Sequence, residues 1–211
     1  MDTRRRIAEA PLEGGHVALD FVNTVGGLRD KPVNPKDEMI ETYDDLITWC
    51  GRVGLLAGRD ARLLLRAASR NGAEARRMTR RAHELRELVY AIFRSIADGD
   101  EPDAPLLVRL RDLEREALAE ARLASDGNAM RWTWPAPREL AAPLWQVAHA
   151  AVDLLTRGPL SRIKVCANCR WLFLDQSRNH SRRWCSMAEC GTQIKQRRFV
   201  ERRRQSRRRG H

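Results

Sequence analysis

Four of the five cysteines in this 211-residue chain fall within 25 residues near the C-terminus. They are Cys166, Cys169, Cys185 and Cys190, and their spacing is C-x2-C-x15-C-x4-C. A Cys-x2-Cys turn can direct two thiolates at one tetrahedral metal, and a second pair about fifteen residues later completes the ligand set. Four sulfur ligands leave no open coordination position, so the spacing predicts one structural Zn2+. The alternative is a set of four unrelated buried thiols.

The composition limits where such a chain resides. Apolar residues make up 43% of it, which is enough for one domain with a core plus a small appendage. It has no uninterrupted apolar run of the length that spans a membrane, and its first six residues lead into no apolar signal segment. We therefore expect a cytoplasmic protein with no membrane contact. In that reducing compartment paired cysteines serve metals rather than disulfides, and the lone Cys50, in an apolar helical stretch, is expected in the core.

The positive charge is confined to the cysteine-rich end. The net charge is +11, yet residues 158–211 hold 15 Lys and Arg against three acidic residues, and the rest of the chain holds 24 against 25. A solvated helix face usually mixes signs, whereas the runs 202–204 and 207–209 are arginine only. Such a run repels itself unless a polyanion neutralises it, which predicts a nucleic-acid-binding segment attached to a neutral domain.

Hydrophobic periodicity predicts a mainly helical body over residues 1–157. Apolar residues at three- and four-residue steps indicate helices over about 42–53, 59–71, 73–98, 106–121 and 138–156. Asp126-Gly127 between two alternating stretches predicts a β-hairpin over 122–134, and the prolines of residues 28–41 indicate a loop. The apolar segment 16–25 is too short for periodicity to separate strand from helix. The fold class is thus mainly α with a small β-hairpin, an α+β arrangement.

Residues 158–211 are predicted to form a separate small zinc-binding finger. Short β-like stretches at 163–165 and 171–175 flank the first cysteine pair, and the second pair leads into a helix that begins near Met187. One pair on a hairpin and one at a helix start describe a treble-clef-like or ribbon-like finger with a basic C-terminal helix. A module of this size has too little core to fold unaided, so metal binding supplies folding free energy, on the order of 10 kcal/mol.

Several short segments of this finger carry a family resemblance. Cys166-x2-Cys169, Leu172-Phe173-Leu174-Asp175, Ser177-Arg178-Asn179, Ser181 to Met187 and Cys190-Gly191 resemble the CGNR-type zinc finger of bacterial transcription regulators. In that family Gly-Asn-Arg normally follows the fourth cysteine. Here Gly191-Thr192-Gln193 follows it, so no metal ligand is lost, but any contact made by the Asn and Arg must be replaced or weakened.

The N-terminal body carries a second resemblance. Leu19-Asp20-Phe21-Val22-Asn23-Thr24, the Asp45-Leu46-x2-Trp49 segment and the helices after them are similar to the ABATE domain, which typically precedes this finger. The resemblance implies a stress-responsive transcription regulator in which the body senses a signal or dimerises and the finger engages DNA.

The basic segment offers candidate nucleic-acid contacts. Arginines that surround a helix predict backbone affinity rather than fine base reading, and any base reading would come from residues near the metal such as Gln193. Duplex DNA is the favoured partner, and RNA is the alternative, because arginine-rich segments bind both. The candidates are Arg178, Asn179, Arg182, Arg183, Lys195, Arg197, Arg198, Arg202, Arg203 and Arg204.

A small-molecule effector would need a pocket in the body. His16, Asp20 and Asn23 lie close together beside glycines and are the candidates to line one, although Asp20 and Asn23 can equally cap or pin a buried segment. No nucleophile–base pair, phosphate loop or His-Glu metal motif accompanies them, so we expect no enzyme activity. The exposed helix faces allow a homodimer without requiring one. His180 is expected to be a loop or phosphate-contacting residue, because four thiolates already fill the metal shell.

Overall fold

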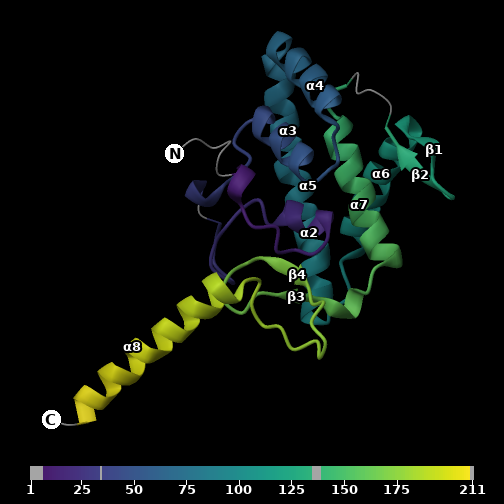
Figure 1. The fold of residues 1–211 in the computed structure, drawn as a ribbon. Helices are drawn as coiled ribbons and strands as arrows, with labels where there is room; N and C mark the ends of the chain where they lie inside the picture. Colours follow the sequence, from purple (N-terminus) through teal and green to yellow (C-terminus); the bar gives the residue numbers. More distant parts are fainter. Residues whose placement is uncertain (1–6, 34, 135–138, 210–211) are drawn as a thin grey trace.

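The computed structural model describes residues 7–33, 35–134 and 139–209 of the chain (Figure 1). The helices of the body are α2 (Val17–Val22), α3 (Tyr43–Arg52), α4 (Gly58–Arg70), α5 (Gly72–Asp98), α6 (Ala104–Glu120) and α7 (Ala142–Arg157). Two antiparallel hairpins join them, β1 (Arg122–Asp126) with β2 (Ala129–Thr133) and β3 (Ile163–Val165) with β4 (Leu172–Leu174). The chain continues into α8 (Thr192–Arg209). The predicted fold class, mainly α with small hairpins and a basic C-terminal helix, is confirmed.

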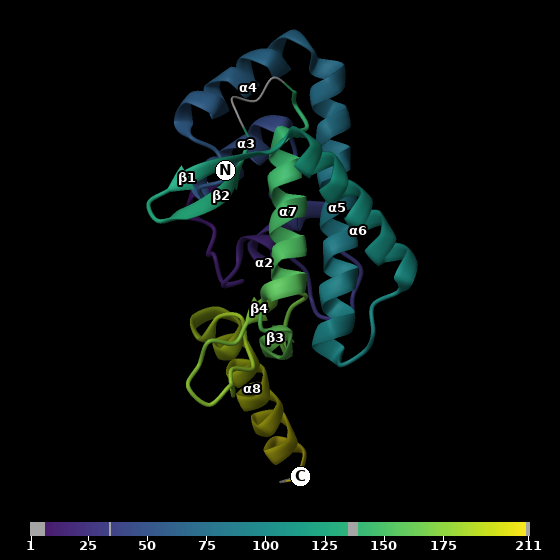
Figure 2. The same cartoon turned by 90° about the vertical axis from the view of Figure 1, so that its right-hand side faces the viewer.

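Helix α5 is the central element of the body. Its 27 residues begin after Asn71, whose side chain accepts a hydrogen bond from the Glu74 N–H, and end at Gly99 in the left-handed conformation with φ 89°. It contacts α2, α3, α4, α6 and α7, which surround it (Figure 2). Its buried face is the periodic set from which the helix was predicted: Met78, Ala82, Leu85, Leu88, Val89, Ile92 and Phe93.

The start of α3 follows directly from its sequence. Thr42 Oγ1 accepts from the Asp45 N–H at 3.2 Å, and Asp45 Oδ2 accepts from the Thr42 N–H at 2.8 Å, which is a complete capping box. The predicted helix start is therefore confirmed. Cys50 near its end is fully buried, as expected of a core thiol, and burial raises the pKa of that thiol.

The segment that the sequence left undecided is the short helix α2. Its Leu19, Phe21 and Val22 are all buried, and its six residues are too few for a 3.6-residue period to be recognised. His16 caps its N-terminus. The backbone of Gly14 lies so close to the helix that a Cβ atom there would be 2.7 Å from the Asp20 nitrogen, so this position requires glycine. The structure therefore decides for helix over strand.

The β1–β2 hairpin is present where the sequence predicted it, with a turn shifted by one residue. Asp126 pairs with Ala129, so the loop is Gly127-Asn128, and Gly127 adopts φ 61°. Leu123 and Met130 on this hairpin are exposed.

The hairpin β3–β4 lies against the body rather than apart from it. Strand β3 contacts α5, and β4 contacts α2. Ile163, Val165, Leu172 and Leu174 belong to the same buried cluster as the body helices. Helix α8 instead projects away from the body (Figure 1). None of the helices in the described residues is both long and apolar enough to cross a membrane.

Candidate metal centre and nucleic-acid interface

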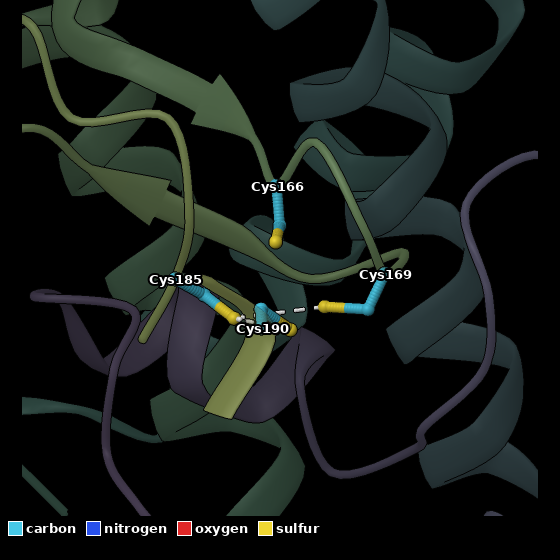
Figure 3. A group of neighbouring side chains, drawn as sticks. All are labelled: Cys166, Cys169, Cys185 and Cys190. Atoms are coloured by element: carbon cyan, nitrogen blue, oxygen red, sulfur yellow. Dashed lines mark hydrogen bonds between the residues drawn. The ribbon is translucent and has the colours of Figure 1, made fainter. Parts of the chain in front are cut away.

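The four cysteine sulfur atoms converge between the β3–β4 hairpin and the start of α8 (Figure 3). Cys166 directly follows β3, and Cys169 lies in the turn before β4. Cys185 ends the long loop after β4, and Cys190 lies in a π-helical turn, Met187–Gly191, that runs into α8. The predicted arrangement, one cysteine pair on a hairpin and one at a helix start, is the one that the structure shows.

The sulfur positions fit a tetrahedral metal. All four Sγ atoms lie within 4.8 Å of one another, and Cys185 Sγ lies 3.6 Å from both Cys169 Sγ and Cys190 Sγ. A Zn–S bond of about 2.3 Å places sulfur atoms about 3.8 Å apart at the corners of a tetrahedron. Cys169 is half-buried and the other three cysteines are buried, so the shell is closed. The prediction of one structural Zn2+ is confirmed, and the alternative of unrelated thiols is not.

The electrostatics of the cluster favour a cation. Hydrogen bonds from the Cys169 and Cys185 thiols and from the Asn168 N–H lower the pKa of Cys166 below its usual range. The pKa values of Cys169 and Cys185 are raised, because each would share a confined site with another thiolate. A divalent cation removes this conflict by neutralising the thiolates together.

Aromatic side chains shield the sulfur cluster. Trp171, Phe173 and the half-buried Trp184 pack with the cysteines in one apolar cluster, which Met39 of the body also contacts. The Trp171 Nε1–H donates to the Val25 carbonyl at 3.0 Å. The shielding of the metal site therefore includes residues of the body as well as of the finger.

A loop of the body also pairs with the turn that carries the first two cysteines. Leu28 forms an antiparallel backbone bridge with Cys169, and the Arg170 N–H donates to the Gly27 carbonyl at 3.1 Å. Backbone pairing of this kind fixes the position of a metal ligand relative to the body.

Arg170 anchors the same turn through its side chain. Its guanidinium donates to Glu87 Oε2 at 2.9 Å and lies 4.1 Å from the centre of the Tyr90 ring, both on α5. The residue is only 4% exposed. Sequence reasoning counted Arg170 as part of the basic excess and missed this role. Its place directly after Cys169, beside apolar Trp171, is the one signal that set it apart from the exposed arginines.

Asn23 joins α2 to β4. Its Nδ2 donates to the Leu172 carbonyl at 2.8 Å, and its Oδ1 accepts from the Leu172 N–H at 3.0 Å. Two residues further along β4, the Leu174 N–H donates to the Gly14 carbonyl at 2.8 Å. Asn23 is 4% exposed, so its side chain completes the hydrogen bonding of a buried strand edge.

The other two candidate pocket residues have local partners. His16 Nδ1 accepts from the Ala18 N–H, and Asp20 Oδ1 accepts from the Gly14 N–H at 2.8 Å. Of the two interpretations offered by the sequence, capping and pinning a buried segment is the one these contacts show.

The long loop before Cys185 is organised around a buried carboxylate. Burial by itself raises the pKa of Asp175, but hydrogen bonds from Lys164 at 2.6 Å and from Ser177 hold it below its usual range. Asp175 Oδ2 also accepts from the Arg182 N–H at 3.0 Å. His180 lies in this loop and not among the cysteines, and its ring Nδ1 lies 3.4 Å from the Asp175 carbonyl oxygen.

Two family models match the chain. A family model for the ABATE domain, described as "Putative stress-induced transcription regulator", matches residues 15–158. The chain belongs to the ABATE family. A second model, the CGNR zinc finger, matches residues 162–203, which include all four cysteines. No curated protein matches the sequence. Both resemblances noted in the sequence are thereby confirmed.

The CGNR finger of this ABATE protein presents its basic residues chiefly on α8. Over the side chains that the structure describes, nearly every residue of α8 is exposed, including the predicted Lys195, Arg197, Arg198, Arg202 and Arg203. Arg197 also donates to Asn168 Oδ1 at 3.2 Å, which ties the first turns of α8 to the metal site. Arg204 lies in α8, but its side chain is outside the described part of the chain. The predicted basic surface therefore exists as one projecting helix.

The remaining candidates divide between exposed and internal positions. Arg178, Asn179 and Arg183 are exposed on the loop before Cys185, and Arg183 lies against the Trp184 ring at 5.6 Å. Arg182 instead turns inward. Its guanidinium donates to Glu13 and to the Cys185 carbonyl and lies 4.8 Å from the centre of the Phe173 ring. Arg182 therefore holds the finger to the N-terminal segment and is the least available of the predicted contacts.

Thr192 and Gln193, which stand where the family has Asn and Arg, both make contacts within the finger. Gln193 Oε1 accepts from Asn168 Nδ2 at 2.9 Å, so the turn between the first two cysteines is joined to α8. Thr192 Oγ1 donates to the Met187 carbonyl across the π-helical turn. Gln193 therefore has a structural contact within the finger, and base reading would be a second role for it.

Proposed function

We propose that this chain is a zinc-dependent DNA-binding transcription regulator whose α8 and adjoining loop contact the duplex. The observation that carries the proposal is the exposure of α8, a basic helix that stands away from the body with only Glu201 to offset its charge (Figure 1). A free cationic helix of this kind needs a polyanion to neutralise it.

The dimensions of α8 suit a DNA groove. Its 18 residues extend about 27 Å, and the major groove, about 12 Å wide, admits one α-helix. Lys195, Arg198 and Arg202 fall on one face at helical spacing, where they reach phosphates of one backbone. Arg178 and Arg183 on the exposed loop extend the basic surface beyond the base of the helix.

The metal supplies the geometry rather than any reaction. By fixing Cys190 to the β3–β4 hairpin, Zn2+ holds the first turn of α8 and thus the direction in which the helix projects. In this role the protein acts in the cytoplasm, where it binds chromosomal DNA, and it catalyses no reaction. The body serves as the part that receives a signal or dimerises.

The decisive experiment uses the zinc-loaded full chain. Fluorescence anisotropy would follow its binding to a labelled DNA duplex of about three helical turns, in competition with a structured RNA of equal charge, at several salt concentrations. About six phosphate contacts predict a loss of roughly a thousandfold in affinity between 50 and 200 mM salt. Preference for RNA by tenfold or more would replace the DNA proposal with an RNA- or ribosome-associated role, and failure to bind either would end both.

A second measurement gives the number of protein copies bound to each duplex. Sedimentation of the chain with and without duplex distinguishes one copy per site from two. Two copies would predict a DNA site with half-sites about one helical turn apart.

A further inference from the structure

The ABATE body contains a cavity of about 540 Å³ on a side remote from the metal centre. Its lining comes from the β1–β2 hairpin, the α3–α4 turn with the start of α4, and the first half of α7. Figure 2 shows these elements away from α8. Cavities of about 300–1,000 Å³ with apolar walls and a few polar groups are typical of small-molecule sites. The residues that bear on its chemistry are Leu55, Asp60, Trp132, Trp134, Gln146 and His149.

Two tryptophans from the hairpin give the cavity an aromatic wall. Trp134 is held in place, because its Nε1–H donates to the Ala117 carbonyl at 2.9 Å and its ring centre lies 5.2 Å from that of His149. Trp132 is 39% exposed although it is a large apolar side chain. A fixed ring beside an exposed one favours a flat aromatic occupant.

Several polar groups line the cavity. His149 Nδ1 lies 2.7 Å from Glu114 Oε1, so this ring nitrogen already has a partner within the protein. Asp60 in the first turn of α4 adds a carboxylate to the lining. The Thr133 hydroxyl donates to the Arg122 carbonyl and is thus already used.

We propose that this cavity binds a planar aromatic molecule that carries a cationic amino group. The ring stacks against Trp132 and Trp134, and the ammonium donates to the Asp60 carboxylate. Arg131 also contributes to the lining and has an interaction within the protein, so the cavity is not purely acidic. A cation beside two indole rings gains further stabilisation from their π faces.

The cavity is connected to the zinc finger by a single helix. Ala142, Gln146 and His149 of α7 line it, and the same helix ends at Arg157, shortly before β3. Helix α7 also packs on α2, which holds β4 through Asn23. This site deepens the sensing part of the proposed function, but ligand binding can be measured in the absence of DNA, so the two proposals fail separately.

Isothermal titration of the zinc-loaded full chain with 1-naphthylmethylamine and 1-naphthylacetate tests the site. The two probes share a ring system and differ in charge. We expect one amine per chain with a Kd below about 1 mM and binding of the acetate that is at least about tenfold weaker. Because the chain carries a net charge of +11, non-specific attraction would favour the acetate, and the expected order cannot arise from overall charge.

Two variants locate the binding. Asp60→Asn and Trp132→Ala change accessible side chains and should each weaken amine binding about five- to tenfold. Asp100→Asn after α5 and Phe199→Ala on α8 are the matched exposed controls and should leave it unchanged. Absence of amine binding up to about 10 mM, equal binding of both probes, or equal losses in the control variants would each overturn the proposal.

Discussion

At the scale of single residues, Asn23 joins the two family segments most directly. Its amide forms both a donor and an acceptor bond with the Leu172 backbone in a buried setting. Asn23→Ala leaves a buried N–H and a buried carbonyl without these partners, which should lower the free energy of unfolding by roughly 2 kcal/mol. The melting temperature of the zinc-loaded chain, measured by calorimetry, should fall by about 4–8 °C.

The control for this prediction is Asn128→Ala, which changes an exposed asparagine in the β1–β2 turn. It should change the free energy of unfolding by about 0.5 kcal/mol or less, as surface substitutions do, and should therefore shift the melting temperature only slightly. If Asn23→Ala had the same melting temperature as this control, the amide would not stabilise the contact between α2 and β4 that the geometry indicates.

Asp20 gives a prediction on pH. Burial raises the pKa of this carboxyl to about 6 from its ordinary 3.8, although the Gly14 N–H donates to it. A raised folded-state pKa contributes stability that is complete below about pH 3.8 and is lost as pH rises through about 6. Asp20→Asn keeps an oxygen acceptor for Gly14 and removes the buried charge.

The variant should therefore melt above the wild type at about pH 7.5, and the difference should shrink as the pH falls toward about 5. Differential scanning fluorimetry of both zinc-loaded proteins across this range measures it. Asp100→Asn, at an exposed position after α5, is the matched control for the loss of a surface carboxylate. A difference for Asp20→Asn that did not change with pH would argue against a buried ionised carboxylate.

Residue-level prediction succeeded where the chemistry was local. The four cysteines could be assigned to a metal from spacing alone, because tetrahedral ligation constrains both spacing and residue type. Asn23 and Arg170 could not be assigned, since their partners Leu172 and Glu87 lie 149 and 83 residues away in the chain. Their roles depend on how the finger packs on the body, which no local pattern encodes.

At the scale of elements, the proposed contact of α8 with DNA phosphates can be tested directly. Arg198 and Arg202 are exposed and one turn apart, as are Arg66 and Arg70 on α4. If α8 carries the phosphate contacts, the double variant Arg198→Ala/Arg202→Ala should reduce the slope of log affinity against log salt by about 2, at roughly 0.9 per phosphate contact. Anisotropy titrations of one duplex at several salt concentrations give that slope.

The double variant Arg66→Ala/Arg70→Ala removes the same charge from the body and is the matched control. It should leave the slope unchanged, because only contacts that release counterions enter it. Equal reductions in the two double variants would mean that DNA is attracted by net charge rather than by α8.

The elements themselves were predictable to different degrees. Helices α3 and α5 carry capping residues and a clear apolar stripe, and both were located within a residue or so of their ends. Helix α2 has only six residues, four of them buried, so it is too short for a period to be detected. The β1–β2 turn was displaced by one residue, since Asp126 can be either the last strand residue or the first turn residue.

At the scale of the whole molecule, the finger and the body share one core. The apolar residues of β3 and β4 lie in the buried cluster of the helices, and loop residues of the body pair with the turn that holds Cys169. The sequence suggested a small module with too little core to fold unaided, to which metal binding supplies folding free energy. The structure shows that β3 of this segment also packs on α5 and that β4 packs on α2.

This sharing predicts one cooperative unit. Burial of the four finger side chains Ile163, Val165, Leu172 and Leu174 contributes up to about 6–12 kcal/mol at about 1.5–3 kcal/mol each. That is comparable with the whole stability of a typical domain, about 5–15 kcal/mol. A chain ending at residue 157 should therefore lose most of its stability, and its melting transition, followed by circular dichroism, should be broad or shifted down by more than about 10 °C.

A chain ending at residue 199 is the control, because it removes most of the projecting helix and keeps the metal site and the shared core. It should melt with the full chain. Removal of zinc from the full chain by a chelator should lower the same single transition, since the cysteine turn that pairs with Leu28 is then no longer held. Two separate transitions, with only the smaller one sensitive to the chelator, would instead describe an independent finger attached to a body that needs no metal.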